Sequence, residues 1–163
     1  MVWSTDYTPE YPASSVLILG KEDGWLDNDK RNYWLAETKE TIGQGFKIKL
    51  DTCARWIAGV QIKNLRGGRS NTHSATKGFR VTASVSENGE TLVQDELDDT
   101  RNKPASLLNF TFKEPVKIRF IKFELLSYWG EHGGGLQYFA AIPVASKQHT
   151  KIIICMIGRW AYD

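Results

Sequence analysis

Oxygen-bearing side chains crowd one short segment near the N-terminus. Between residues 20 and 32 the chain carries Asp23, Asp27, Asn28, Asp29 and Asn32. Calcium takes about six to eight oxygen ligands and accepts irregular geometry, so a loop of this composition can bind it. The alternative is a solvated polar turn in which Asp and Asn serve turn formation. Asp27 and Asp29 are the strongest ligand candidates, and Asn32 stands behind them.

A second group of side chains suits sugar recognition. Its members come from three turn-rich segments and are Arg66, Arg69, His73, Arg101, Trp129 and His132. Arginine and histidine donate hydrogen bonds to hydroxyl groups, and an indole offers a flat apolar face to the C–H side of a pyranose. The glycines 133–135 let a backbone approach a ligand closely or form a tight loop. The alternative makes the basic residues solvated loop charges and Trp129 a core residue.

The sequence offers little for catalysis. The three histidines, His73, His132 and His149, lack the spacing of metal ligands. Neither a Gly-x-Ser-x-Gly elbow nor a phosphate-binding glycine loop followed by Lys-Ser/Thr occurs. We therefore predict a binding module and no enzyme.

Strands are the elements that must position these side chains. Apolar and polar residues alternate over 46–50, 60–63, 79–85 and 108–113, which puts one face of each segment in a core and the other in water. Asn88-Gly89 favours a hairpin, because both central positions of a type I′ turn need positive φ. The pattern predicts an antiparallel β-sandwich or jelly roll of about eight strands, with less than about a tenth helix.

The segment 116–125 changes its inward parity midway. Apolar residues occupy even positions in its first half, as Ile118 does, and odd positions in its second half, as Phe123 does. A strand whose parity flips usually contains a β-bulge. The sequence predicts a bulge near Phe120-Ile121.

Length and charge narrow the class of protein. A chain of 163 residues is long enough for one domain with its own core. The net charge is +2, from 21 basic and 19 acidic residues, and no basic cluster is long, so we expect no nucleic-acid partner. No apolar run approaches the length of a membrane span, and the N-terminus lacks the basic and apolar regions of a signal peptide.

The ordered series of segments resembles the coagulation factor V/VIII type C, or discoidin, domain, a galactose-binding-like jelly roll. The resemblance extends from Pro12 to about Ile142. The similar segments are Leu26–Trp34, Phe46–Asp51, Ile57–Asn64, Gly78–Val81, Ile118–Phe123 and Tyr128–Leu136. This sequence has Asn28 where the family has glycine and Asn32 where it has threonine, and its last strand lacks the glutamate of many members.

The resemblance implies a discoidin-like domain over 1–146, with 147–163 as a tail or an extra edge strand. It implies that loops at one end of the sandwich form a recognition surface and that Asp27, Asp29 and Asn32 bind calcium. Trp34 matches a core tryptophan of the family. We expect Trp56 in the core too, and Trp25 as an exposed residue of the acidic loop.

The expected function is carbohydrate binding by a lectin-like module, assisted by calcium, with glycans or glycoproteins as partners. The alternative is an adhesion module that contacts a protein or membrane surface, with Trp25-Leu26 as the exposed apolar residues that insert into it. An extracellular setting is expected, and the sequon Asn109-Phe110-Thr111 gives it weak support. The sequence leaves the oligomeric state open. It also leaves open whether Cys53 and Cys155 pair or remain two buried thiols.

Overall fold

The computed structural model describes residues 3–5, 13–17, 33–36, 43–50, 53–65, 74–84, 90–100, 105–130 and 133–144. These residues form nine strands and one 3-10 helix. In chain order the elements are β1 Trp3–Ser4, η1 Ala13–Leu17, β2 Trp34–Leu35, β3 Gly45–Lys49, β4 Arg55–Asn64, β5 Gly78–Ser84, β6 Glu90–Glu96, β7 Leu107–Ile118, β8 Phe120–Leu125 and β9 Gly135–Pro143. Strands therefore dominate the described part of the chain, as predicted.

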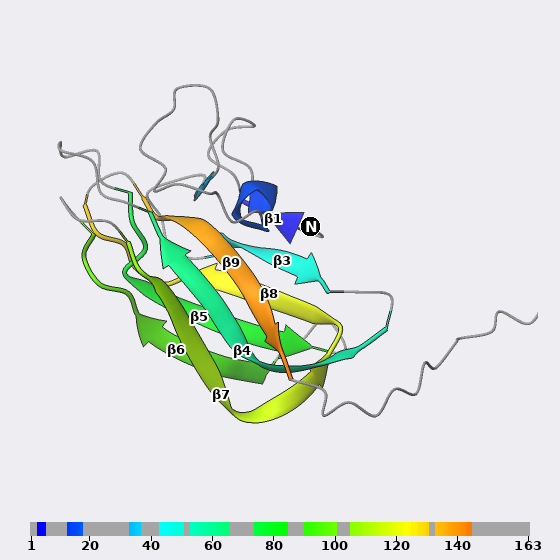
Figure 1. The fold of residues 1–163 in the computed structure, drawn as a ribbon. Coiled ribbons are helices and arrows are strands. Elements are labelled where there is room, and N and C mark those ends of the chain that lie inside the picture. Colours follow the sequence, from blue (N-terminus) through cyan, green and yellow to red (C-terminus); the bar gives the residue numbers. More distant parts are fainter. Residues whose placement is uncertain are drawn as a thin grey trace, which may run out of the picture.

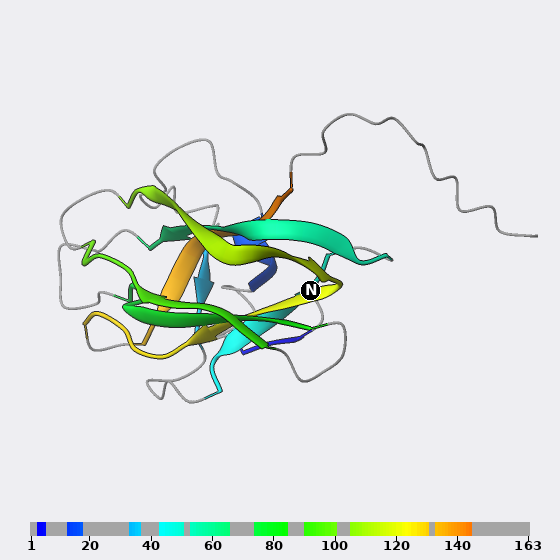
Figure 2. The same ribbon diagram turned by 90° about the horizontal axis from the view of Figure 1, so that it is seen from below.

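The strands form two sheets in which every pairing is antiparallel. One sheet has the order β1-β3-β8-β5-β6, and the other has the order β2-β9-β4-β7. Figure 1 shows β9, β4 and β7 in front of β8, β5 and β6, and Figure 2 shows the two layers one above the other. The predicted antiparallel β-sandwich is confirmed.

Burial along the strands follows the predicted alternation. In β8 the inward residues Ile121, Phe123 and Leu125 are at most 1% exposed, whereas Lys122 and Glu124 between them are partly exposed. Inward side chains of both sheets fill the space between the layers. β5 and β6 pair as the predicted hairpin requires, and the turn at 88–89 lies outside the described residues.

The segment 116–125 is two strands and not one bulged strand. β7 ends at Ile118, β8 begins at Phe120, and Arg119 forms the bend between them. β7 belongs to the four-stranded sheet and β8 to the five-stranded sheet. The predicted bulge at Phe120-Ile121 is wrong. The parity flips because the chain crosses between sheets, whose buried faces look into the core from opposite sides.

Aromatic rings from both sheets form the centre of the core, with Phe123 in their midst. Its ring stacks on Phe46 at 5.1 Å and on Phe79 at 5.8 Å between centroids, and it meets Trp34 edge-on at 6.0 Å. Such pairs contribute about 0.5–1.5 kcal/mol each beyond the area they bury. Trp34 is fully buried, and its indole N–H donates to the Thr5 carbonyl at 2.8 Å. The core position predicted for Trp34 is confirmed.

Trp56 does not occupy the core position expected for it. It is 57% exposed near the start of β4, opposite Lys117 of β7. The β4–β7 register shifts between Ile57 and Gly59. Ile57 faces the core at this end of the strand, so its neighbour Trp56 faces solvent.

Cys53 is exposed, so the expectation of two buried thiols is wrong for this residue. Its pairing with Cys155 is untested, because Cys155 and the whole segment 147–163 lie outside the described residues. Among the described residues, no helix is long and apolar enough to cross a membrane.

Candidate functional site

The bases of the three predicted recognition loops are hydrogen-bonded to each other. Segment 66–73 departs after Leu65, and the Leu65 carbonyl accepts a hydrogen bond from Thr100 Oγ1 at 2.5 Å. Segment 101–104 departs after that same Thr100. Segment 131–132 follows Trp129 and Gly130, and the Trp129 backbone N–H donates to the Ala75 carbonyl at 2.8 Å. The loops that carry Arg66, Arg69, His73, Arg101 and His132 therefore begin at one end of the sandwich.

The acidic segment re-enters the described chain at the same end. β2 follows it and pairs with the start of β9, with Trp34 opposite Leu136 and Leu35 opposite Gly135. The Thr76 hydroxyl donates to the Gly135 carbonyl at 2.9 Å. A Cβ on Gly135 would overlap the Trp34 carbonyl oxygen, so glycine is required for this close approach.

Asn64, the last residue of β4, joins that strand to Thr76, just before β5, beneath these loops. Its side chain is buried, with the residue 4% exposed. Oδ1 accepts from the backbone N–H groups of Leu65 and Thr76, each at 3.0 Å. Nδ2 donates to the Thr76 carbonyl at 2.7 Å and reaches the Asp98 carbonyl at 3.5 Å. One amide thus connects the two ends of the loop 66–73 to the segment after β6.

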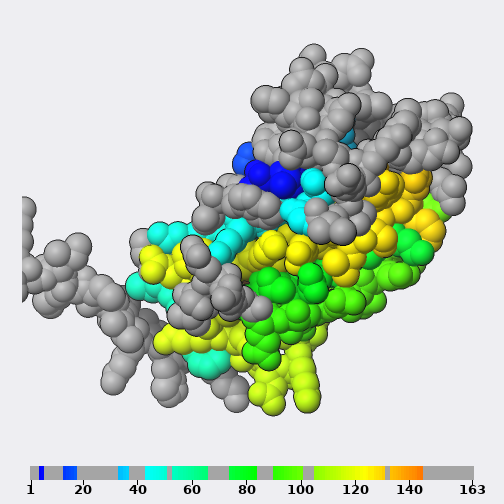
Figure 3. Space-filling view, turned by 180° about the vertical axis from the view of Figure 1, so that it is seen from behind, coloured from blue at the N-terminus to red at the C-terminus, as the bar shows by residue number. Residues whose placement is uncertain are grey.

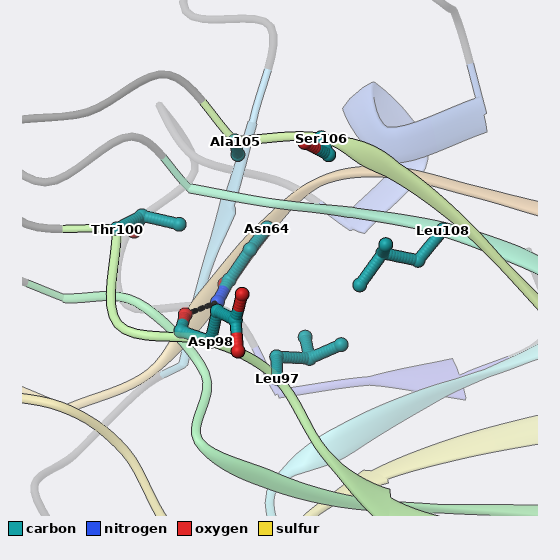
Figure 4. A pocket seen from close by; sticks show the side chains of 7 residues that line it. All are labelled: Asn64, Leu97, Asp98, Thr100, Ala105, Ser106 and Leu108. Carbon is teal, nitrogen blue, oxygen red and sulfur yellow. Dashed lines mark hydrogen bonds between the residues drawn. The ribbon is translucent and has the colours of Figure 1, made fainter.

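A small hollow of about 110 Å³ opens beside Asn64 (Figure 4). Its lining combines apolar and polar side chains: Asn64, Leu97, Asp98, Thr100, Ala105, Ser106 and Leu108. Ligand pockets usually measure about 300–1,000 Å³, so the hollow is the size of a subsite. The segment 101–104 departs from Thr100 and returns at Ala105, two residues that line the hollow.

Trp129 is held at this end by its own polar group. Its indole Nε1–H donates to the Leu97 carbonyl at 3.0 Å, and the ammonium group of Lys77 lies 4.9 Å from the ring centroid. The residue is partly exposed. The structure therefore fixes the orientation of the ring, and sugar stacking on Trp129 stays a prediction.

The other predicted site residues lie outside the described residues. They are Arg66, Arg69, His73, Arg101 and His132 for the ligand, and Asp27, Asp29 and Asn32 for calcium. In the part of the chain that the structure describes, no group of three His, Cys, Asp or Glu side chains is arranged to hold a metal ion.

Sequence reasoning missed three residues of this end: Asn64, Lys77 and Thr100. For Asn64 a signal existed, because it follows Val60 and Ile62 at the inward positions of β4 and is polar where a core residue is expected. Lys77 and Thr100 gave no such signal, since both lie in segments without alternation.

The sequence pattern of the Sad1/UNC-like C-terminal family matches residues 31–135, more than half of the chain. The chain belongs to the Sad1/UNC-like C-terminal family. The matched region of this Sad1/UNC-like domain begins just before β2 and ends at the first residue of β9. No curated protein matches it closely enough in sequence to serve as a relative.

Solved structures similar to the Sad1/UNC-like domain share its discoidin-like fold. The family 32 carbohydrate-binding module of NanJ from Clostridium perfringens, solved with galactose, aligns with a TM-score of 0.60 at 15% identity, over 84% of this chain and 88% of that one. Discoidin II of Dictyostelium discoideum aligns with a TM-score of 0.58 at 16% identity, over 90% of this chain and 56% of that one.

A chitosan-binding module from a Paenibacillus chitosanase/glucanase aligns with a TM-score of 0.55 at 12% identity, over 85% of this chain and 89% of that one. These identities are low, so the likeness establishes the fold. The predicted discoidin-like jelly roll is confirmed, and the Sad1/UNC-like domain shares this fold with carbohydrate-binding modules.

Proposed function

We propose that this Sad1/UNC-like domain is a carbohydrate-binding, lectin-like module that recognises glycans or glycoproteins through the loops at one end of its sandwich. The observation that carries the proposal is the hydrogen-bonded convergence of the three loop bases at one end of the sandwich, where the bases of segments 66–73 and 101–104 border the hollow beside Asn64. The domain binds its ligand without transforming it. The carbohydrate-binding modules that share its fold are consistent with this role.

The described residues supply both kinds of surface that a sugar needs. Leu97 and Leu108 give the hollow an apolar side, while Thr100 and Ser106 give it hydroxyl groups. A pyranose likewise combines apolar C–H faces with hydroxyl groups. The Thr100 hydroxyl already donates to the Leu65 carbonyl, so it can only accept a hydrogen bond from a sugar. The hydroxyl of the exposed Ser106 can donate or accept.

A glycan array tests the proposal, with Trp129→Ala as the main variant and Trp56→Ala as its control. Like Trp129, Trp56 is an accessible tryptophan, but it lies near the start of β4, away from the loop bases. We expect Trp129→Ala to weaken glycan binding about tenfold, which corresponds to about 1.4 kcal/mol. Trp56→Ala should leave the affinity unchanged.

Trp129→Phe separates recognition from stability. It keeps an aromatic face and removes the donor to Leu97, whose loss costs about 0.5–1.5 kcal/mol of folding free energy. Retained sugar binding by Trp129→Phe, together with its loss in Trp129→Ala, supports stacking. If Trp129→Ala, Trp129→Phe and Trp56→Ala all bound glycans with the same affinity, the adhesion module would be favoured instead. Binding of the domain to protein or vesicle surfaces that carry no glycan would also favour it.

Calcium assistance belongs to the same proposal and rests on the composition of the acidic loop. A ligand that binds only the folded state raises its stability by mass action. We expect calcium to raise the melting temperature of the wild type and Asp27→Ala to abolish this rise. Asp95→Ala, at an exposed position of β6, is the matched control and should keep it. An identical melting curve for the wild type in calcium and in chelator would remove calcium from the proposal.

We also propose that the domain is extracellular. Asn109 of the sequon is exposed on β7, which lies at the edge of its sheet. A glycan attached there would project away from the core.

A further inference from the structure

The outer face of the five-stranded sheet gathers cations over its central strands. Its outward positions on β3, β8 and β5 carry Lys47, Lys49, Lys122 and Arg80, and Arg119 adjoins them at the bend before β8. We call these five residues, together with Phe120 among them, the basic face. Figure 3 views the molecule from this side, where β3, β8, β5 and β6 form one continuous surface.

The sheet register places two of these cations directly opposite each other. Lys47 of β3 pairs with Lys122 of β8 in the antiparallel ladder, and Lys49 pairs with Phe120. Like charges directly opposite across two strands are destabilising. The Lys122 ammonium contacts Glu124 and the Lys47 ammonium contacts the Phe120 ring, so Lys47 has a cation and no carboxylate opposite it in the ladder.

Two cations of the basic face lie against the ring of Phe120. Lys47 Nζ lies 5.1 Å and the Arg119 guanidinium carbon 5.6 Å from the centroid of its ring. Cation–π attraction orients both groups, although their charges repel. Arg119 Nε is buried and has no hydrogen-bond partner within the structure. The two side chains are thus positioned by a ring and not by a carboxylate.

Acidic residues neutralise only part of the basic face. Glu124 is the only acidic residue on β3, β5 and β8, and it pairs with Arg80 at 3.1 Å and with Lys122 at 3.3 Å. Burial alone would raise the pKa of Glu124, but the Arg80 hydrogen bond and the Lys122 charge outweigh it and lower the pKa. Among the described residues, no carboxylate pairs with Lys47, Lys49 or Arg119.

We propose that the basic face is a second binding surface, for sulfated polysaccharides, separate from the loop end. Sulfate groups repeat along such a polymer, and repeated anions match cations spaced about 5–7 Å apart across and along a sheet. An acidic peptide fits less well. It would need a groove or a free strand edge, whereas β8 is hydrogen-bonded to β3 on one side and β5 on the other.

Heparin serves as the probe, with chemically desulfated heparin and polyglutamate as comparison polymers. We expect the wild type to bind heparin, to release it as salt concentration rises, and to bind the other two polymers at least about tenfold more weakly. The triple variant Lys47→Gln/Lys49→Gln/Arg119→Gln should lose about tenfold or more in heparin affinity, because several exposed charge contacts disappear together.

A charge-matched control separates this surface from net charge. Lys63→Gln/Lys113→Gln/Lys117→Gln removes the same three charges from β4 and β7 of the other sheet, and we expect it to keep heparin affinity within about threefold. Equal losses in the two triple variants would reduce the effect to net charge and overturn the proposal. Equal affinity for polyglutamate, or no heparin binding by the wild type, would overturn it as well.

Heparin binding by the basic face should not depend on the residues of the loop end. Trp129→Ala should bind heparin as the wild type does, and the basic-face variant should keep its affinity on the array of neutral glycans. Failure of the neutral-sugar proposal would therefore leave the heparin result standing, and the reverse is also true.

Discussion

Replacing Asn64 by alanine should destabilise the fold at the loop end. The substitution removes three hydrogen bonds of 2.7–3.0 Å in a residue that is 4% exposed. The Thr76 carbonyl loses the 2.7 Å donor, and burial of an unsatisfied group costs about 1–3 kcal/mol. The Thr76 N–H keeps a weaker acceptor, the Gly135 carbonyl at 3.3 Å. The Leu65 N–H is only part-buried, so water can replace part of its loss.

These contributions sum to about 2–4 kcal/mol of lost unfolding free energy, most of it from the Thr76 carbonyl. For a domain of this size that corresponds to a fall in melting temperature of roughly 5–15 °C. Urea unfolding, followed by circular dichroism, measures the free energy directly. Asn109→Ala is the matched control, because Asn109 is exposed on β7 and surface substitutions usually stay within about 0.5 kcal/mol.

Asn64→Asp tests which half of the amide matters. It keeps an acceptor for the two backbone N–H groups but removes the donor to Thr76, and it places a carboxylate against that carbonyl. We expect it to be at least as destabilising as Asn64→Ala at pH 7 and less so in acid, where the carboxylate is protonated. Stability of Asn64→Ala within about 0.5 kcal/mol of the wild type would refute the role assigned to this network.

Two further predictions concern the five-stranded sheet. The folded-state pKa of Glu124 lies below its ordinary value of 4.5, so between these two pKa values the unfolded state binds more protons than the folded state. The stabilisation by the ion pairs of Glu124 is therefore lost as the pH falls through the folded-state pKa. Glu124→Gln should therefore be less stable than the wild type at pH 7. The difference in unfolding free energy, measured by urea titration, should shrink as the pH falls through the folded-state pKa of Glu124. A difference that does not change with pH would contradict this. A Cβ on Gly45 would overlap the backbone carbonyl oxygen of Phe123. Gly45→Ala should therefore lower the unfolding free energy by about 1–3 kcal/mol, as measured by thermal unfolding. A melting temperature equal to that of the wild type would show that the β3–β8 ladder adjusts to the added methyl group.

Residue patterns alone predicted the parts of the candidate site, and its assembly at one end of the sandwich was implied only by the family resemblance. Turn-forming composition located the loops with Arg66, Arg101 and Trp129, since turn chemistry is encoded locally. Which loops share an end depends on strand order, which local patterns do not encode. The hydrogen bonds of Thr100, Asn64 and Trp129 show it for the loop bases. The Lys77 ammonium over the Trp129 ring is likewise a contact between segments far apart in the sequence.

The sequence by itself determined the strands and most of the core. Alternation with a period of two is a local property, and it placed Phe46, Val81 and Phe123 inside before any pairing was known. Trp34 followed from the family resemblance. These residues face inward in any antiparallel sandwich built from the same strands, so their burial did not depend on the order of the strands.

Only the tertiary structure decided the features that depend on pairing and on sheet order. A β-bulge and a crossing between sheets produce the same parity change in the sequence around Arg119. Only the pairing partners of β7 and β8 show that the chain crosses between sheets here. Trp56 is exposed because a register shift in β4 turns it outward. Lys47 and Lys122 lie 75 positions apart in the chain, and they become opposite neighbours only when β3 pairs with β8. Side-chain periodicity is fixed by neighbours along one strand, whereas register is fixed by the energy of packing two strands together.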